Sequence, residues 1–224
     1  MGVDLVDVLR EPAAAIAVHT YFAENTNTRY TGRRFDTLDG GGTRPDIRDR
    51  IAPSDLVAVQ MLSVRVPAEV SIDLLDGQVG HSIADCLREI DVGVTLGSPA
   101  AAELIADGGS AERAWSLLVA QDGVEFVIAG KILARKRPHL IPVYDRVVRC
   151  QFGHPRHVWQ LLHDRLERDD RVRATLAGLH EQAGLPSAVS LLRVLDVVLW
   201  MRHHQQHRRN ADLACPGRGT VRPL

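Results

Sequence analysis

Cysteine and lysine are both scarce in this chain of 224 residues. Its cysteines, Cys86, Cys150 and Cys215, are odd in number and widely spaced, which excludes a disulfide framework and a zinc ribbon. We therefore expect a reducing, cytoplasmic environment. The two lysines, Lys131 and Lys136, lie close together, whereas the rest of the 27 basic residues are arginines spread along the chain. We therefore expect the segment 122–149, which contains both lysines, to carry the function.

The chain also lacks a charge excess of either sign and any long apolar run. A formal net charge of -1 gives no global attraction to nucleic acid or to a membrane, so binding to either needs a local cluster. No apolar stretch approaches the roughly 20 residues of a membrane span. The first residues carry acids where a secretory signal needs bases. We expect a soluble protein with no membrane partner.

Strand-type alternation is scarce, and helical signals recur instead. Proline or serine opens several segments whose apolar residues follow helical spacing. The segments predicted as helices include 12–24, 100–106, 111–119, 126–134, 158–166, 172–183 and 189–207. A hydrophobic content of 45% over this length is sufficient for one sizeable core. The sequence therefore predicts an all-α, or mainly α, single domain over 1–210 and a flexible tail over 211–224.

Residues 25–52 form a long polar stretch rich in glycine, with room for a short strand pair around 30–38. A loop of this length is uncommon unless it is a lid, a binding loop or a linker. It brings together aromatic and basic side chains, namely Tyr30, Arg33, Arg34 and Phe35. These groups suit stacking on a base and contact with a phosphate. Alternatively, Tyr30 and Phe35 fix the loop to the core.

The segment 122–149 combines a glycine turn, an apolar helix, a basic run and an acid. Gly123 lies between two helical patterns, which indicates a tight helical hairpin. The second helix ends in three cations, where the helix dipole favours positive charge and Pro138 stops the helix: Arg135, Lys136 and Arg137. We interpret this basic end either as a solvated helix terminus or as a contact for phosphate or another anion.

The sequence GVEFVIAGKILARKRPHLIPVYDRVVR resembles the core of the helix-hairpin-helix DNA glycosylase superfamily. In that family a Gly-Val-Gly hairpin precedes an Ala-rich helix, a Lys-Pro-type turn, an apolar stretch and an Asp near a helix N-terminus. Gly123, Val124 and Ala129 occupy the matching positions, and Asp145 lies beside the position of the family's catalytic acid. The resemblance implies a two-lobed helical fold. It also implies that Asp145 stabilises cationic charge on a sugar, or activates a water, while a base is cleaved.

Three departures from the family pattern modify this expectation. Glu125 replaces the second hairpin glycine, which normally lets backbone amides approach a phosphate. Val127 stands where lyase-type members carry their Schiff-base lysine, so the resemblance implies displacement by water. The four cysteines that bind an iron–sulfur cluster in some members of the family are absent too. The whole chain also resembles a group of actinobacterial proteins of comparable length and unknown function.

We therefore predict a glycosylase-like protein that binds a nucleic acid, a nucleoside or another small anionic ligand between two lobes. The alternatives are a non-catalytic nucleic-acid-binding protein on the same scaffold and an enzyme acting on a small metabolite. Asp145 is the predicted catalytic residue. The predicted ligand-binding residues are Gly123, Lys131, Arg135, Lys136, Arg137, Tyr144, Arg146, Arg149, Tyr30, Arg33, Arg34 and Phe35.

The purely structural interpretation of Asp145 is an acid that is stabilised by the dipole at a helix start and paired with Arg149 at i+4. We expect no cofactor and no metal. The histidines around Pro155 lack a Cys or an acid at ligand spacing. His203, His204 and His207, near the end of the last predicted helix, are interpreted as a solvated cationic terminus or a second anion contact. The sequence leaves the oligomeric state open.

Overall fold

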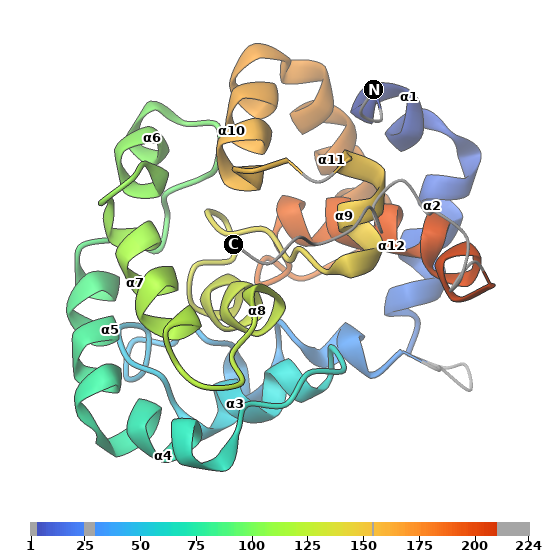
Figure 1. Cartoon of the computed structure of the whole chain (residues 1–224). Helices are drawn as coiled ribbons and strands as arrows, with labels where there is room; N and C mark the ends of the chain where they lie inside the picture. Colours follow the sequence, from blue (N-terminus) through green and yellow to red (C-terminus); the bar gives the residue numbers. More distant parts are fainter. Residues whose placement is uncertain (1–3, 25–29, 154, 210–224) are drawn as a thin grey trace.

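The computed structural model describes residues 4–24, 30–153 and 155–209, and in these ranges every regular element is helical. Figure 1 shows their arrangement. The α-helices are α1 (Leu5–Arg10), α2 (Pro12–Phe22), α3 (Pro53–Gln60), α4 (Ala68–Asp76), α5 (Gln78–Arg88), α6 (Pro99–Ile105), α7 (Ser110–Val119), α8 (Phe126–Lys136), α9 (Arg146–Phe152), α10 (Val158–Arg168), α11 (Asp170–Gln182) and α12 (Leu191–Arg209). The all-α prediction is confirmed. The predicted tail, 211–224, lies outside the described residues.

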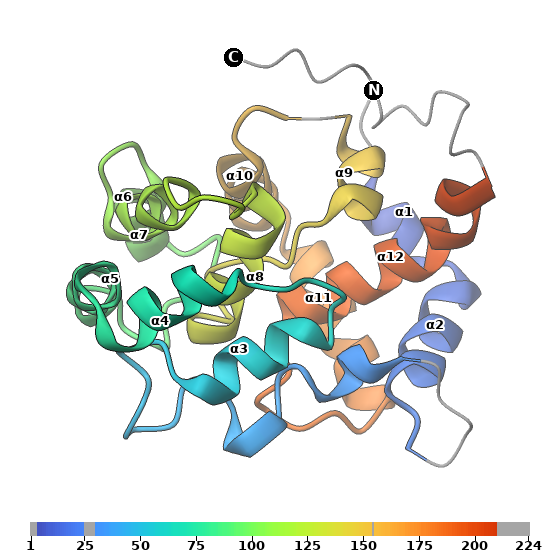
Figure 2. The same cartoon turned by 60° about the horizontal axis from the view of Figure 1, so that its bottom comes forward.

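The helices pack in two groups that lie next to each other (Figure 2). In one group α7 packs on α5, α6 and α8, and α8 packs on α3. In the other group α12 packs on α2, α9 and α11, and α1 packs on α11. Helix α10 packs on α11 in this second group, and its contacts with α6 join the two groups. Within the described ranges, no helix is long and apolar enough to span a membrane.

Helix α12 runs through the middle of the second group because its first half is apolar except for Arg193 and Asp196. Its buried apolar residues, each at most 3% exposed, include Val194, Leu195, Val197 and Val198. A helix that is hydrophobic all round is buried. The helix therefore fixes the positions of its few polar residues inside the protein.

The stretch that follows residue 29 folds as two short 3₁₀ helices, η1 (Thr31–Arg34) and η2 (Leu38–Gly40), so the predicted strand pair around 30–38 is wrong. Asp39, Gly40 and Gly41 all have positive φ angles, of 51°, 74° and 91°. Successive residues in this region turn the chain and cannot continue an extended strand. Residues 25–29 of the predicted loop lie outside the described residues.

The basic run at the end of α8 is buried beneath this loop. Arg135 donates through Nε to Asp55, at 3.2 Å, and through its two Nη atoms to the carbonyls of Phe35 and Leu38. Lys136 donates to the same Asp55 carboxylate, at 2.9 Å, and to the carbonyl of Ile47, at 2.8 Å. Two cations of α8 thus share one buried carboxylate of α3.

Arg137, the third cation of the basic run, also contacts the loop. Its guanidinium donates to the Arg48 carbonyl at 2.7 Å, to the Asp49 carboxylate at 2.7 Å and to the Ile90 carbonyl at 2.9 Å. Arg135, Lys136 and Arg137 are only 2%, 0% and 1% exposed. The predicted phosphate contact is therefore wrong for all three, and so is the solvated helix end, because their donors hold the loop against α8.

The contact between the loop and α8 depends on the lack of a side chain at Gly42. A Cβ atom there would come within 2.3 Å of the Arg135 carbonyl oxygen. We expect Gly42→Ala to lower the free energy of unfolding by about 1–3 kcal/mol, measured by urea denaturation. The control is Gly178→Ala in α11, where nothing lies within 4 Å of the added Cβ. This change should stabilise the protein by about 0.5–1 kcal/mol. Equal stability of Gly42→Ala and wild type would contradict the packing described here.

Candidate functional site

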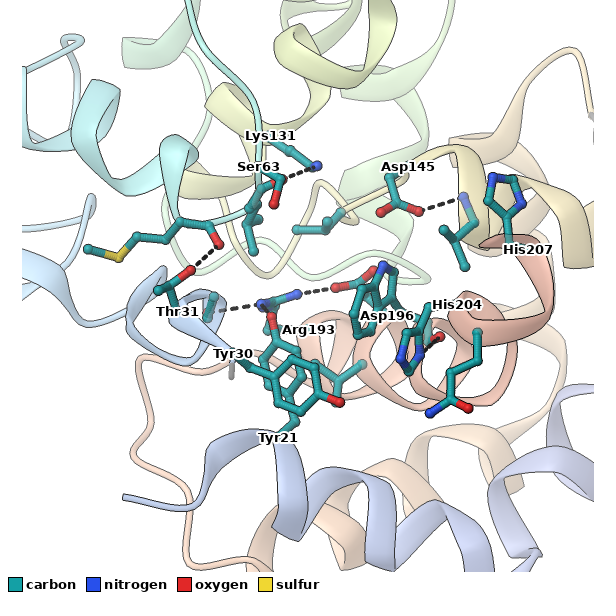
Figure 3. Close-up of a pocket in the computed structure, with 18 residues that line it drawn as sticks. Tyr21, Tyr30, Thr31, Ser63, Lys131, Asp145, Arg193, Asp196, His204 and His207 are labelled. Carbon is teal, nitrogen blue, oxygen red and sulfur yellow. Dashed lines mark hydrogen bonds and ion pairs between the residues drawn. The ribbon is translucent and has the colours of Figure 1, made fainter. Parts of the chain in front are cut away.

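A pocket of about 640 Å³ lies between the two groups of helices (Figure 3). Its walls come from α2, η1, the turn after α3, α8, the segment leading into α9, and α12. Ligand pockets of proteins commonly enclose about 300–1,000 Å³. The volume is therefore suitable for a small organic ligand.

Asp145 lines this pocket and is also the N-cap of α9. Its Oδ1 accepts hydrogen bonds from the backbone amides of Val147, at 2.9 Å, and Val148, at 3.0 Å. These amides have no partner within the helix, so an Asp at this position stabilises the helix start. Arg149 places its guanidinium over the Phe126 ring, 5.0 Å from its centroid. The N-cap interpretation is thus correct, but among the described residues Arg149 forms no ion pair with Asp145. The Asp145 carboxylate is in addition presented to the pocket.

Lys131 reaches the same pocket from α8. It is 4% exposed, and Nζ donates to the Leu62 carbonyl at 2.8 Å. Burial lowers the pKa of Lys131, and the negative charges of Asp145 and Asp196 partly offset this effect. No second hydrogen-bond partner of this ammonium occurs among the described residues. Its remaining N–H groups are therefore available to a ligand.

Arg193 of α12 forms the floor of the pocket and is 3% exposed. Its guanidinium donates to the carboxylates of Asp36, at 3.3 Å, and Asp196. It also donates to the Tyr21 hydroxyl at 2.7 Å and to the Gly32 carbonyl at 3.0 Å. The side chain thus connects α2, η1 and α12, and its donors are used within the protein. Arg193 therefore holds the walls of the pocket together.

Asp196 lies beside Arg193, and its pKa is raised to about 7. The main cause is burial, to which the charge of Asp145 adds, whereas Arg193 and Lys131 act in the opposite direction. Burial also raises the pKa of Asp36. The Arg193 guanidinium therefore lies between two buried acids, Asp36 and Asp196. Near neutral pH, a proton on Asp196 neutralises part of their negative charge.

This raised pKa predicts a pH dependence of stability. Because the pKa of Asp196 rises from 3.8 to about 7 on folding, the folded protein binds more protons than the unfolded one between these values. The stabilisation is complete below the lower value and is lost as pH rises towards 7. Asp196→Asn should therefore gain stability relative to wild type by roughly 1 kcal/mol per pH unit over this range. Denaturation of both proteins at pH 5, 6 and 7 measures this difference, and a constant difference would contradict the prediction.

Aromatic rings form the wall opposite Lys131 and Asp145 (Figure 3). Tyr30 stacks on Tyr21 with 5.2 Å between ring centroids. Trp200 stacks on His204 at 4.1 Å, and its edge meets Tyr30 at 5.7 Å. Aromatic faces of this kind bind flat ligand rings by stacking. The pocket thus has one aromatic wall and one charged wall.

Several predicted ligand-binding residues do not line the pocket. Tyr144 is buried between the rings of Phe126 and Phe152, at 6.3 and 6.4 Å. Its hydroxyl finds no hydrogen-bond partner within the described part of the chain, and burial raises its pKa to about 12. Arg146 is exposed and pairs with Glu125. The aromatic surroundings of Tyr144 identify it as a packing residue.

Four further predicted residues lie on turns or on the short helix η1, outside the pocket lining. Gly123 is an exposed turn residue with a φ of 76°, which suits glycine. Arg33 and Arg34 lie on η1 outside the pocket lining, half-buried and exposed respectively. Phe35 is 1% exposed beneath the Arg193 guanidinium, at 5.5 Å, so it fixes the loop to the core. Of the predicted residues, the pocket brings together Tyr30, Lys131 and Asp145.

The sequence contained a signal for the residues that were missed on α12. In LLRVLDVVLW, Arg193 and Asp196 are the only charged residues of an otherwise apolar helix segment. Charges within such a segment are buried with it and must be paired or protonated. The i, i+3 spacing places the two on one face. Tyr21 and Trp200 carried no comparable signal.

Comparison with known proteins assigns the chain to a family. Residues 14–203 match the model of a family of unknown function, DUF6308, and the chain belongs to this family. No curated protein and no solved structure matches the chain.

Proposed function

We propose that the pocket binds a nucleoside-like ligand and that the protein hydrolyses its N-glycosidic bond, with Asp145 as the reactive carboxylate. The observation that supports this most is the pairing of an aromatic wall with a carboxylate and an ammonium in one pocket of about 640 Å³. A nucleoside has a flat base joined to a polar sugar. The two halves of such a ligand match the two walls.

The aromatic wall would hold the base. Tyr30 belongs to a stack with Tyr21 and borders Trp200, so a flat ring entering the pocket meets aromatic faces. Stacking of a base on an aromatic side chain contributes about 1–3 kcal/mol and tolerates any base. We therefore expect binding of a class of ligands that share a base and a sugar.

The charged wall would act on the sugar. Cleavage of an N-glycosidic bond places positive charge on the sugar ring, and a fixed carboxylate stabilises that charge or takes a proton from the attacking water. Two hydrogen bonds from the backbone amides of Val147 and Val148 hold the Asp145 carboxylate in place, so little reorganisation is needed. Asp196, with a pKa of about 7, retains a proton in part of the molecules at neutral pH and could donate it to the leaving base. Lys131 would bind a sugar oxygen or a phosphate.

The position of the basic run favours a nucleoside-sized ligand over duplex DNA. A protein that follows a nucleic-acid backbone needs several surface cations. Arg135, Lys136 and Arg137 are buried and already paired, and Glu125 adds an exposed negative charge at the hairpin. These residues do not form a phosphate-binding surface.

The test is an assay of base release. Purified protein is incubated with purine and pyrimidine nucleosides, their 5′-monophosphates and a single-stranded oligonucleotide, and the free base is measured by chromatography. The proposal expects release from one or more of the nucleosides or monophosphates. Release from the oligonucleotide alone would instead support a nucleic-acid substrate. No release from any of them would overturn the hydrolytic role.

A further inference from the structure

Three metal-binding side chains converge where α9 packs on α12. The Sγ atom of Cys150 and a ring nitrogen of each of His203 and His207 lie within 4.8 Å of one another. Cys150 Sγ is 3.2 Å from His207 Nδ1. The cysteine is buried and the histidines are half-buried. This group is not expected from the sequence, where the histidines looked like a cationic helix end.

The geometry follows from the two helices. His203 and His207 are separated by one turn of α12 and so lie on the same face of it. Cys150 lies on α9, which packs against α12. The three ligands therefore come from two packed elements, and no loop must close to bring them together. Two imidazoles and one thiolate suit Zn²⁺ and similar borderline-soft cations.

We propose that Cys150, His203 and His207 bind one divalent transition-metal ion of the Zn²⁺ class, with a water molecule as the fourth ligand. Three protein ligands and one exchangeable position are typical of zinc sites that are not purely structural. His207 also lines the pocket, so the exchangeable position would be open to an oxygen atom of a pocket ligand. Binding converts the Cys150 thiol to a thiolate and releases its proton to solvent, so affinity should fall at low pH. This proposal does not depend on N-glycosidic hydrolysis.

Cobalt substitution tests the site directly. The full chain is treated with a chelator, dialysed and titrated with Co²⁺, whose thiolate charge-transfer band reports a Co–S bond and whose visible bands report tetrahedral geometry. We expect saturation at one equivalent and loss of these bands when Zn²⁺ is added. Cys150→Ser should abolish the charge-transfer band, and His207→Gln should weaken Co²⁺ binding by more than about tenfold.

The matched control removes both of the other cysteines. The double variant Cys86→Ser, Cys215→Ser should keep the charge-transfer band. Circular dichroism checks that each variant is folded. If Cys150→Ser does not fold, His203→Gln is titrated with Co²⁺ in its place. The proposal is overturned if Co²⁺ produces no charge-transfer band, if the band survives Cys150→Ser, or if binding is unchanged in both histidine variants. The last two results would indicate nonspecific binding to other thiols or histidines.

Discussion

Replacing Asp145 with Asn is expected to reduce base release by about 10²- to 10⁴-fold, the usual contribution of a positioned acid or base. The substitution isolates the chemistry because Asn is as good an N-cap as Asp. Its side-chain oxygen can accept from the amides of Val147 and Val148, as Oδ1 does now. The fold of α9 should therefore survive while the negative charge is lost. Steady-state kinetics and a thermal melt, measured side by side, separate the two effects.

Asp169 provides a matched control for this experiment. It is also the N-cap of a helix, α11, and accepts from the Arg171 amide, but it lies outside the pocket that contains Asp145. Asp169→Asn should leave base release unchanged. If Asp145→Asn retained full activity, or if both variants lost activity equally, Asp145 would be only a structural cap.

Replacing Asp55 with Asn is expected to cause the second large effect, a loss of stability. Asp55 is 0% exposed and is the shared carboxylate for Arg135 and Lys136, besides accepting from the Ala52 amide. Loss of its charge removes the ion-pair partner that the buried cations Arg135 and Lys136 share. Breaking a buried ion pair by removing one partner costs about 3–5 kcal/mol. We expect a loss of this size in the free energy of unfolding, measured by chemical denaturation.

The control for this variant lies in the loop that covers the end of α8. Asp39 pairs with Arg44 at 3.1 Å, but its side chain is 50% exposed. Exposed pairs contribute about 0–1 kcal/mol, and Asn tolerates the positive φ of Asp39. Asp39→Asn should therefore change stability by less than about 1 kcal/mol. Equal losses for Asp39→Asn and Asp55→Asn would contradict the special role of the buried carboxylate.

Much of the helical architecture could be predicted because local signals specify it. The expected helix at 126–134 is observed as Phe126–Lys136, and that at 158–166 as Val158–Arg168. Proline or a capping residue at a helix start and apolar residues at helical spacing act within a few residues of each other. The resemblance to helix-hairpin-helix glycosylases remains a prediction.

The failures concern interactions between distant parts of the chain. The cations at 135–137 have partners at 35–55, and nothing local in the sequence shows that loop carbonyls will cover a helix end. The pocket likewise combines residues from both ends of the chain: Tyr21 and Arg193 are in direct contact across 172 positions. Asp145 and Lys131 could be chosen because the hairpin pattern includes them. Tyr30 could be chosen as well, from the aromatic and basic side chains of its loop. Tyr21 and Trp200 could not, because only the packing of α2 on α12 brings these two rings together.

The most direct test of the central claim is ligand binding reported by Trp200. In the double variant Trp115→Phe, Trp159→Phe, the only remaining tryptophan is Trp200, which lies in the aromatic wall. Titration with a nucleoside 5′-monophosphate should change its fluorescence saturably, and Tyr30→Ala in the same background should weaken or abolish that change. If the fluorescence does not respond, or if the response is the same after Tyr30→Ala, the pocket does not bind nucleoside-like ligands as proposed.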